Sequence, residues 1–187
     1  MNLRWCLELA VGCALAAIAG ITFDACSSKA LRKKPFPTMP PPTVTVRLLG
    51  PDGRPATPST VEKVILEEDE WQRRLNPEPY RVTRGKGTER PFCGGFLGEK
   101  KAGTYFCVCC DLPLFSSETK FESGTGWPSF FQPFAKENVQ EHRDMGHGMA
   151  RTEILCARCE AHLGHVFDDG PAPTHLRYCL NSAALVF

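Results

Sequence analysis

The segment near the carboxyl end of the chain holds residue types that could support thiol chemistry. Cys179 lies in the run Arg-Tyr-Cys-Leu-Asn, two residues after Arg177 and two before Asn181. Two of the five histidines, His162 and His165, lie shortly before this run. If the run is a strand, alternate side chains project from one face, so the guanidinium, the thiol and the amide share one site. A nearby cation can stabilise a thiolate, the reactive form of cysteine, and an imidazole can exchange protons with it.

A purely structural role fits the same residues. A single cysteine is commonly a small buried side chain, and either histidine could be a hydrogen-bonded core residue. The stretch from Gly124 to Phe130 uses two glycines and a proline to fix a loop that presents Trp127. That indole could form one wall of a pocket or pack in the core under a tight turn, and spacing alone does not distinguish the two.

Four other cysteines have the spacing of a structural metal site. Cys107 with Cys110 and Cys156 with Cys159 form two CxxC pairs, far enough apart for the chain to bring the four sulfurs together. Zn²⁺ accepts four thiolates tetrahedrally, and such a closed site would stabilise the fold and leave catalysis to other residues. Disulfides or a redox-active CxxC would use the same residues. Cys109 makes the choice of pair ambiguous, although it has no partner at a two-residue spacing.

The elements that must position these groups are predicted to be short. Acidic residues at 67–70 suit a first helical turn and predict a helix over 67–75, which Asn76-Pro77 should end. From about Thr88 to Phe187, Gly, aromatic and β-branched residues alternate with breakers and predict short strands joined by loops. We therefore expect a mainly β core.

The first sixty residues are predicted to lie outside this core. Residues 1–26 have the order of an export signal, with a basic start, a largely apolar run and a stretch around Cys26 that is similar to a lipoprotein cleavage site. A lasting membrane anchor is the alternative, although Glu8 in the apolar run would be costly in a bilayer. We expect a Pro-rich tether at 27–60, with a possible hairpin after Thr43, and one folded domain at 61–187. The protein is then expected in the bacterial periplasm or attached to a membrane through its N-terminal segment.

Composition argues against several partners. With 22 basic and 21 acidic residues the formal charge is +1, and no block of one sign is long enough to bind a polyanion, so nucleic acid is not expected. No Gly-rich dinucleotide fingerprint occurs in the sequence, so neither a nicotinamide nor a flavin cofactor is expected.

Four stretches closely resemble the peptide-methionine (R)-S-oxide reductases of the B type. They are Gly-Thr-Glu-Arg-Pro-Phe at 87–92, Ser-Gly-Thr-Gly-Trp-Pro-Ser-Phe at 123–130, His-Leu-Gly-His-Val-Phe-Asp-Asp-Gly-Pro at 162–171 and Arg-Tyr-Cys-Leu-Asn-Ser-Ala-Ala-Leu at 177–185. The resemblance runs from about Glu70 to Phe187. It implies two antiparallel sheets with short N-terminal helices, a structural zinc on the two CxxC pairs, and catalysis by Cys179.

The resemblance also implies roles in the pocket. Trp127 would pack on the methyl group of the substrate, and His165 would be the acid near the sulfoxide oxygen. The remaining pocket residues implied in this way are His162, Phe167, Asp169, Arg177 and Asn181. The substrates would be oxidised proteins or peptides that carry methionine-R-sulfoxide, and the preference for the R epimer rests on the resemblance alone.

The recycling cysteine is the point of departure from the family pattern. Many members carry it where this chain has Thr125, whereas Cys93 occupies the place where another branch keeps its resolving thiol. We expect a sulfenic acid on Cys179, a Cys179–Cys93 disulfide and a thioredoxin-like reductant. Cys109 or direct reduction by an external thiol would be the alternatives. Two rival interpretations are a zinc-ribbon binding module with Cys179 buried, and a disulfide oxidoreductase without zinc.

Overall fold

The computed structural model describes residues 40–187, and these belong to one compact unit, Met39–Phe187. The expected export signal at 1–26 lies outside the described residues. Within 40–187, none of the helices has the length and apolar character needed to cross a bilayer.

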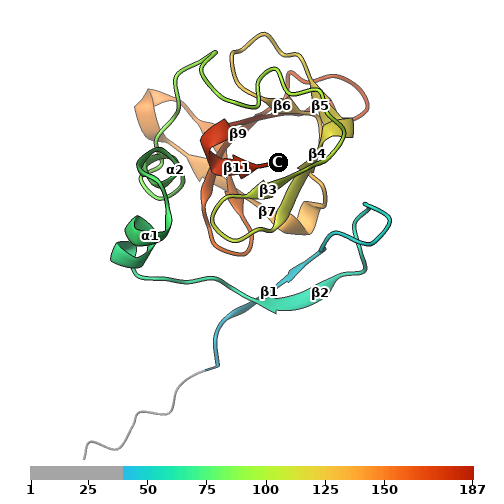
Figure 1. Ribbon diagram of the computed structural model, residues 1–187. Helices are drawn as coiled ribbons and strands as arrows, with labels where there is room; N and C mark the ends of the chain where they lie inside the picture. Colours follow the sequence, from blue (N-terminus) through green and yellow to red (C-terminus); the bar gives the residue numbers. More distant parts are fainter. Residues whose placement is uncertain (1–39) are drawn as a thin grey trace, which may run out of the picture. The chain divides into compact units, whose positions relative to one another are not determined.

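Two antiparallel sheets form the body of this unit (Figure 1). One has six strands in the order β5-β6-β10-β9-β8-β7, and the other has three in the order β11-β3-β4. The six strands are β5 (Lys120–Phe121), β6 (Ser129–Phe130), β10 (Arg177–Leu180), β9 (His162–Phe167), β8 (Arg151–Cys156) and β7 (Val139–Asp144). The three are β11 (Leu185–Val186), β3 (Thr104–Cys107) and β4 (Pro113–Ser116). The predicted mainly β fold with two antiparallel sheets is confirmed.

Aromatic side chains from both sheets meet in the core. Phe130 of the six-stranded sheet lies 5.0 Å from Tyr105 and 4.8 Å from Phe115 of the three-stranded sheet, measured between ring centroids. Tyr178 lies 5.6 Å from Phe115. All four rings are almost completely buried, and tilted or edge-on pairs at these distances are favourable beyond the area they bury. Because Tyr178 faces this core, its neighbour Cys179 must point to the other face of the sheet.

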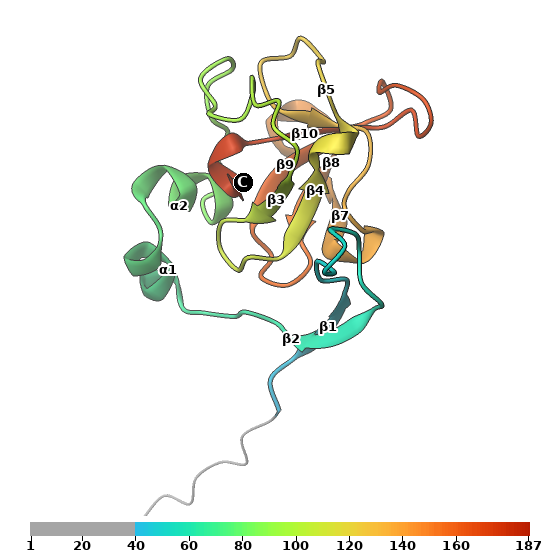
Figure 2. The same cartoon turned by 45° about the vertical axis from the view of Figure 1, so that its right-hand side comes forward.

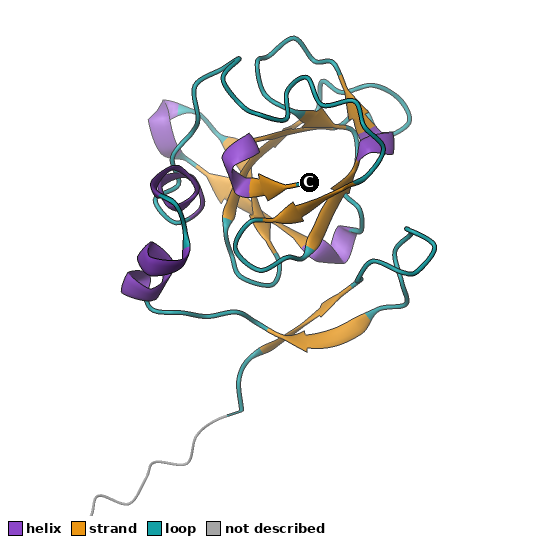
Figure 3. Ribbon diagram, in the orientation of Figure 1, coloured by secondary structure: helices purple, strands orange, loops and turns teal. Residues whose placement is uncertain are grey.

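The helices lie at the margins of the strands (Figure 3). The helix predicted over 67–75 is confirmed as α1 (Glu68–Arg74), with Glu67 and Leu75 as its caps. Pro77 was expected only to end that helix, but it also begins α2 (Pro77–Thr83), since a proline is well suited to a first helical turn. Four short 3₁₀ turns complete the elements: η1 (Ser117–Thr119), η2 (Lys136–Asn138), η3 (Gly146–Gly148) and η4 (Ser182–Ala184).

A third, two-stranded sheet lies outside the two main ones, near β7 (Figures 1 and 2). It is the antiparallel hairpin of β1 (Thr43–Val46) and β2 (Ser59–Glu62). Val46 is fully buried, and the Asn138 side chain accepts from the backbone N–H of Arg47 at 2.8 Å and donates to its carbonyl at 2.7 Å. Part of the expected Pro-rich tether at 27–60 therefore packs on the folded domain. Its Pro-rich composition favoured an extended segment, but strand pairing and the hydrogen bonds to Asn138 hold it in place.

Candidate functional site

The register of the six-stranded sheet places the candidate site on the face away from the core. Cys179 on β10 is the cross-strand partner of His165 on β9, and His165 is in turn the partner of Glu153 on β8. In the adjacent row, Arg177 is the partner of Phe167. Directly opposed residues share a face, so this surface carries a thiol, an imidazole and a carboxylate side by side.

An irregularity in β9 brings both histidines to this face. His162 and His165 are three residues apart and would point to opposite faces of a regular strand. The pairing register of β8 and β9 shifts between Ile154 and Leu155, and the two imidazole rings lie 5.4 Å apart. Gly164 lies between them and leaves no room for a side chain, because a Cβ there would lie 2.0 Å from the carbonyl oxygen of Cys179.

A small pocket opens beside the thiol. It encloses about 120 Å³ and brings together five residues predicted for the site, namely Cys179, His165, Trp127, Phe167 and Asn181. Thr88 and Arg151 also line it and were not predicted. His162, Asp169 and Arg177 do not line it. The His162 ring lies beside the lining residue His165, and Arg177, which is bound to Asp169, lies over the lining residue Phe167.

One loop holds the indole and the amide of the pocket in place. The Trp127 Nε1–H donates to the carbonyl of Glu89 at 3.1 Å, and the N–H of Glu89 donates to Asn181 Oδ1 at 2.9 Å. The Glu89 carboxylate accepts from the backbone N–H groups of Ser182 at 2.6 Å and Ala183 at 3.0 Å. Glu89 therefore ties the Trp127 loop to the first turn of η4, directly after β10.

Cys179 lies in a setting that opposes ionisation. Burial raises the pKa of the Cys179 thiol, and the hydrogen bond from Thr125 Oγ1, 3.9 Å away, and the Arg177 guanidinium only partly offset this. Arg177 forms two 2.8 Å hydrogen bonds to Asp169 and lies 4.4 Å above the Phe167 ring. Arg177 therefore favours the Cys179 thiolate, as expected, but its effect on the pKa of the thiol is smaller than that of burial.

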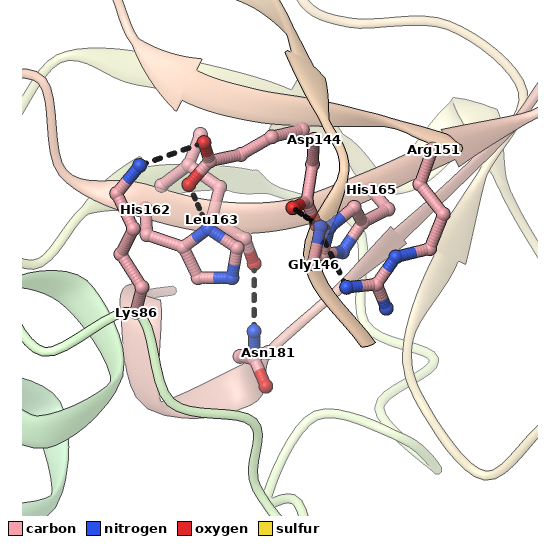
Figure 4. A network of polar contacts seen from close by, with 9 residues as sticks. Lys86, Asp144, Gly146, Arg151, His162, Leu163, His165 and Asn181 are labelled. Atoms are coloured by element: carbon pink, nitrogen blue, oxygen red, sulfur yellow. Dashed lines mark hydrogen bonds and ion pairs between the residues drawn. The ribbon is translucent and has the colours of Figure 1, made fainter. Parts of the chain in front are cut away.

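His165 is hydrogen-bonded to a carboxylate at the end of β7 (Figure 4). Its Nε2 lies 2.8 Å from Asp144 Oδ2, which also accepts from Arg151 Nη2 at 2.7 Å, while the other Asp144 oxygen accepts from the N–H of Gly146 at 2.8 Å. The Gly146 N–H, His165 and Arg151 hold the pKa of Asp144 well below its usual range. An ionised carboxylate can only accept, so Nε2 of His165 carries a proton.

His162 is hydrogen-bonded to a different carboxylate, in a deeper layer. Its Nδ1 lies 2.7 Å from Glu153 Oε1, and Lys86 Nζ donates to Glu153 Oε2 at 2.9 Å. Burial alone would raise the pKa of Glu153, but Lys86 and His162 outweigh it and the pKa is lowered. Burial is also the main reason why the pKa of His162 is lowered, so this imidazole is neutral at pH 7.

Cys93 lies on the exposed loop between α2 and β3, and does not line the pocket. Its loop contacts the loop of the pocket tryptophan, since the Phe92 N–H donates to the Gly126 carbonyl at 2.8 Å. Thr125, the residue before Gly126, contacts Cys179. Cys93 and Cys179 are both free thiols. The Thr125–Gly126 loop contacts Cys179 on one side and the loop of Cys93 on the other.

The two CxxC pairs meet in one buried cluster. The four sulfurs of Cys107, Cys110, Cys156 and Cys159 lie within 4.8 Å of one another, with 3.6 Å between Cys107 and Cys159 and 3.5 Å between Cys110 and Cys156. A tetrahedral ion with ~2.3 Å bonds to sulfur needs edges of about 3.8 Å, so these residues could hold a metal ion. Cys109 is not in the cluster, and its sulfur lies 3.4 Å from Thr83 Oγ1.

Both turns of this cluster have the same backbone geometry. The N–H of Cys107 donates to the Leu112 carbonyl and the N–H of Cys156 to the Ala161 carbonyl, each at 2.9 Å. The residue after each second cysteine is left-handed, with φ of 58° at Asp111 and 60° at Glu160. Two segments far apart in sequence therefore form the same turn, and both turns direct their sulfurs into one cluster.

Sequence reasoning missed the carboxylates that hold the two histidines, Asp144 and Glu153, as well as the bridging residue Glu89. Asp144 and Glu153 lie in strands whose pairing had to be known before either could be placed beside a histidine. Glu89 lies in the stretch 87–92, one of the four that resemble the reductase family, and this resemblance was the signal in the sequence that could have identified it.

Comparison with known proteins identifies the family. The model of the SelR domain matches residues 75–187. A protein of Hahella chejuensis named "Peptide methionine sulfoxide reductase MsrB" is 61% identical over 127 residues, which cover 68% of this chain and 91% of that protein. Proteins of the same name are 59% identical in Pseudomonas putida, over 68% of this chain and 96% of theirs, and 56% identical in Bradyrhizobium diazoefficiens, over 72% and 96%. The chain therefore belongs to the SelR-domain family, that of the B-type peptide methionine sulfoxide reductases.

Proposed function

We propose that this protein reduces methionine-R-sulfoxide in oxidised proteins and peptides to methionine, with Cys179 as the nucleophile. The supporting observation is the small pocket in which the Cys179 thiol, the His165 imidazole and the Trp127 indole come together. A methyl sulfoxide has an apolar methyl group that suits an indole and an oxygen that requires hydrogen-bond donors. The choice of the R epimer is carried over from the family, since each epimer has its own reductase.

In the first step the Cys179 sulfur attacks the sulfoxide sulfur, and the oxygen passes to Cys179. The cysteine is oxidised by two electrons to a sulfenic acid, and the sulfoxide is reduced by two electrons to the thioether of methionine. The thiol proton ends on the sulfenic oxygen. His165, which lines the pocket with Cys179, would act as the acid that delivers a proton to the oxygen as the sulfoxide S–O bond breaks.

In the second step Cys93 attacks the Cys179 sulfenic acid, which forms a disulfide and releases water. A thioredoxin-like protein then reduces the disulfide by thiol exchange. The exposure of Cys93 and the contact of its loop with the Thr125–Gly126 loop support this assignment. Cys109 is less suited, because it lies beside the four-cysteine cluster and contacts Thr83.

We assign the four-cysteine cluster to a structural Zn²⁺, held by Cys107, Cys110, Cys156 and Cys159. Four protein ligands close the coordination sphere, so the ion would stabilise the fold and would take no part in the reaction.

We further assign residues 1–26 to an export signal or N-terminal membrane anchor, and place the enzyme in the periplasm or on a membrane. The family match begins at residue 75, so the N-terminal segment lies outside it. Mass spectrometry of the mature N-terminus would test this assignment. A lipid-modified Cys26 or a cleaved chain would support it, and an intact chain found in the cytoplasm would contradict it.

The reaction is tested by turnover of the two separated epimers of a dabsylated methionine sulfoxide, with dithiothreitol as reductant. We expect turnover of the R epimer only, and none in Cys179→Ser. Cys93→Ser should retain turnover with dithiothreitol and lose it with a thioredoxin system. Intact activity in Cys179→Ser would refute the proposed mechanism.

A further inference from the structure

A buried carboxylate behind the pocket takes no part in the proposed reaction. Glu153 is 5% exposed and His162 is 2% exposed, so neither is freely hydrated. Each oxygen of the Glu153 carboxylate has its own partner, Lys86 Nζ at 2.9 Å and His162 Nδ1 at 2.7 Å. Lys86 reaches this carboxylate from the loop after α2 and His162 reaches it from β9, and both residues are labelled in Figure 4.

The partners of Glu153 fix where the proton of His162 lies. An ammonium group has only donors and an ionised carboxylate only acceptors, so the Nδ1 of His162 must carry the hydrogen that points to Glu153. Since burial keeps this imidazole neutral, its Nε2 holds a lone pair. That Nε2 is buried and has no hydrogen-bond partner among residues 40–187.

The orphan nitrogen belongs to the ring next to a pocket residue. The His162 ring lies 5.4 Å from the ring of His165, which lines the pocket with Cys179. A buried polar atom without a partner is costly, so its retention requires an explanation. A lone pair here suits a donor, such as an ordered water or a protonated group of the reacting site. The other tautomer would instead place the single N–H on the buried Nε2 and turn a lone pair of Nδ1 toward the Glu153 carboxylate.

We infer that Glu153 is a positioning residue for the reduction, which holds His162 in the tautomer protonated on Nδ1 and so keeps an acceptor beside His165. This inference rests on the proposed function, but the tautomer of His162 can be measured independently of activity. Lys86 assists by occupying the second oxygen of Glu153, which leaves only one oxygen for His162.

The substitution Glu153→Gln tests the inference, because Lys86 dictates how the new amide must turn. Glutamine has one carbonyl oxygen, and the Lys86 ammonium requires that acceptor. The amide NH₂ group is then left facing His162 Nδ1 and donates to it, so the imidazole proton moves to Nε2. We expect kcat/KM for methionine-R-sulfoxide to fall at least about tenfold, as happens when the orienting carboxylate of a histidine is changed to its amide.

A double variant gives the sharper test. In Lys86→Met with Glu153→Gln, no ammonium competes for the carbonyl, which can turn to accept from Nδ1 and restore the original tautomer. Most of the activity should return. Lys86→Met alone should keep the tautomer, since the carboxylate remains. Glu118→Gln, the same chemical change at an exposed glutamate, is the matched control and should match the wild-type protein.

The measurements are long-range ¹H–¹⁵N spectra of the His162 ring in the zinc-loaded protein, and turnover with dithiothreitol. Wild-type His162 protonated on Nε2 would overturn the inference without any variant. An unchanged tautomer or unchanged kcat/KM in Glu153→Gln would also overturn it, as would a double variant no better than Glu153→Gln. Lack of sulfoxide turnover by the wild-type protein would instead contradict the proposed function, and the tautomer would still decide this inference.

Discussion

Replacing Gly164 by alanine should damage stability and activity together. A Cβ at this position would lie 2.0 Å from the Cys179 carbonyl oxygen and 3.0 Å from its carbonyl carbon. Both are backbone atoms, which cannot move aside as a flexible side chain can. A normal contact of about 3.2 Å requires β9 and β10 to separate by roughly 1.2 Å, which weakens the hydrogen bonds between them.

The cost follows from two contributions. Overpacking typically costs ~1–3 kcal/mol, and a weakened hydrogen bond adds ~0.5–1.5 kcal/mol. We therefore expect a loss of about 2–4 kcal/mol in the free energy of unfolding, or roughly 4–16 °C in Tm for a domain of this size. The separation also moves Cys179 away from His165, so kcat/KM should fall at least about tenfold.

Thermal unfolding and turnover of the R epimer by zinc-loaded protein would measure the two effects. Gly98→Ala is the matched control, because a Cβ at Gly98 meets nothing within 4 Å, and it should change Tm by less than about 2 °C. A Gly164→Ala variant with the Tm and kcat/KM of Gly98→Ala would refute the steric argument.

Three further predictions concern the thiol, the indole and the metal cluster. Alkylation of Cys179 by iodoacetamide, followed by mass spectrometry in the Cys93→Ser background, should rise with pH through an apparent pKa above the ordinary cysteine value, because burial raises the pKa of this thiol. Arg177→Met should shift that profile further upward, and a downward shift would contradict the assigned role of the charge. Trp127→Ala should lower kcat/KM about 10- to 100-fold through loss of ~1.5–3 kcal/mol of apolar contact, and Trp127→Phe should lose less; equal effects would argue against an apolar wall. Cys156→Ser should lower bound zinc from one ion per chain and reduce Tm, as measured by metal analysis and calorimetry; unchanged metal content would exclude the four-sulfur site.

Local patterns predicted the elements that are governed by local physics. The helix after Glu67 follows from acidic residues placed at the positive end of a helix dipole, which requires no knowledge of the rest of the fold. The two CxxC pairs were also recognisable locally, since a two-residue spacer lets one tight turn direct both sulfurs to the same ion. The family resemblance supplied the two-sheet architecture, which spacing alone did not.

The parts that could not be predicted depend on pairing between distant segments. Glu153 reaches His162 only because the register of β8 and β9 shifts, and nothing in the sequence of either strand indicates that shift. The burial that raises the pKa of Cys179 was missed for a related reason. Arg177 is near it in sequence, but the fold pairs Arg177 with Asp169 and buries the thiol.

The hydrogen bond from Phe92 to Gly126 couples the two halves of the proposed cycle. The residue that follows Phe92 is Cys93, the proposed resolving cysteine, and the residue that follows Gly126 is Trp127, whose indole is proposed to contact the substrate. A displacement of Cys93 toward the oxidised nucleophile must therefore pull on the wall of the pocket. Formation of the disulfide would then weaken the contact between the pocket and the methionine product. Product release and disulfide formation would therefore be coupled.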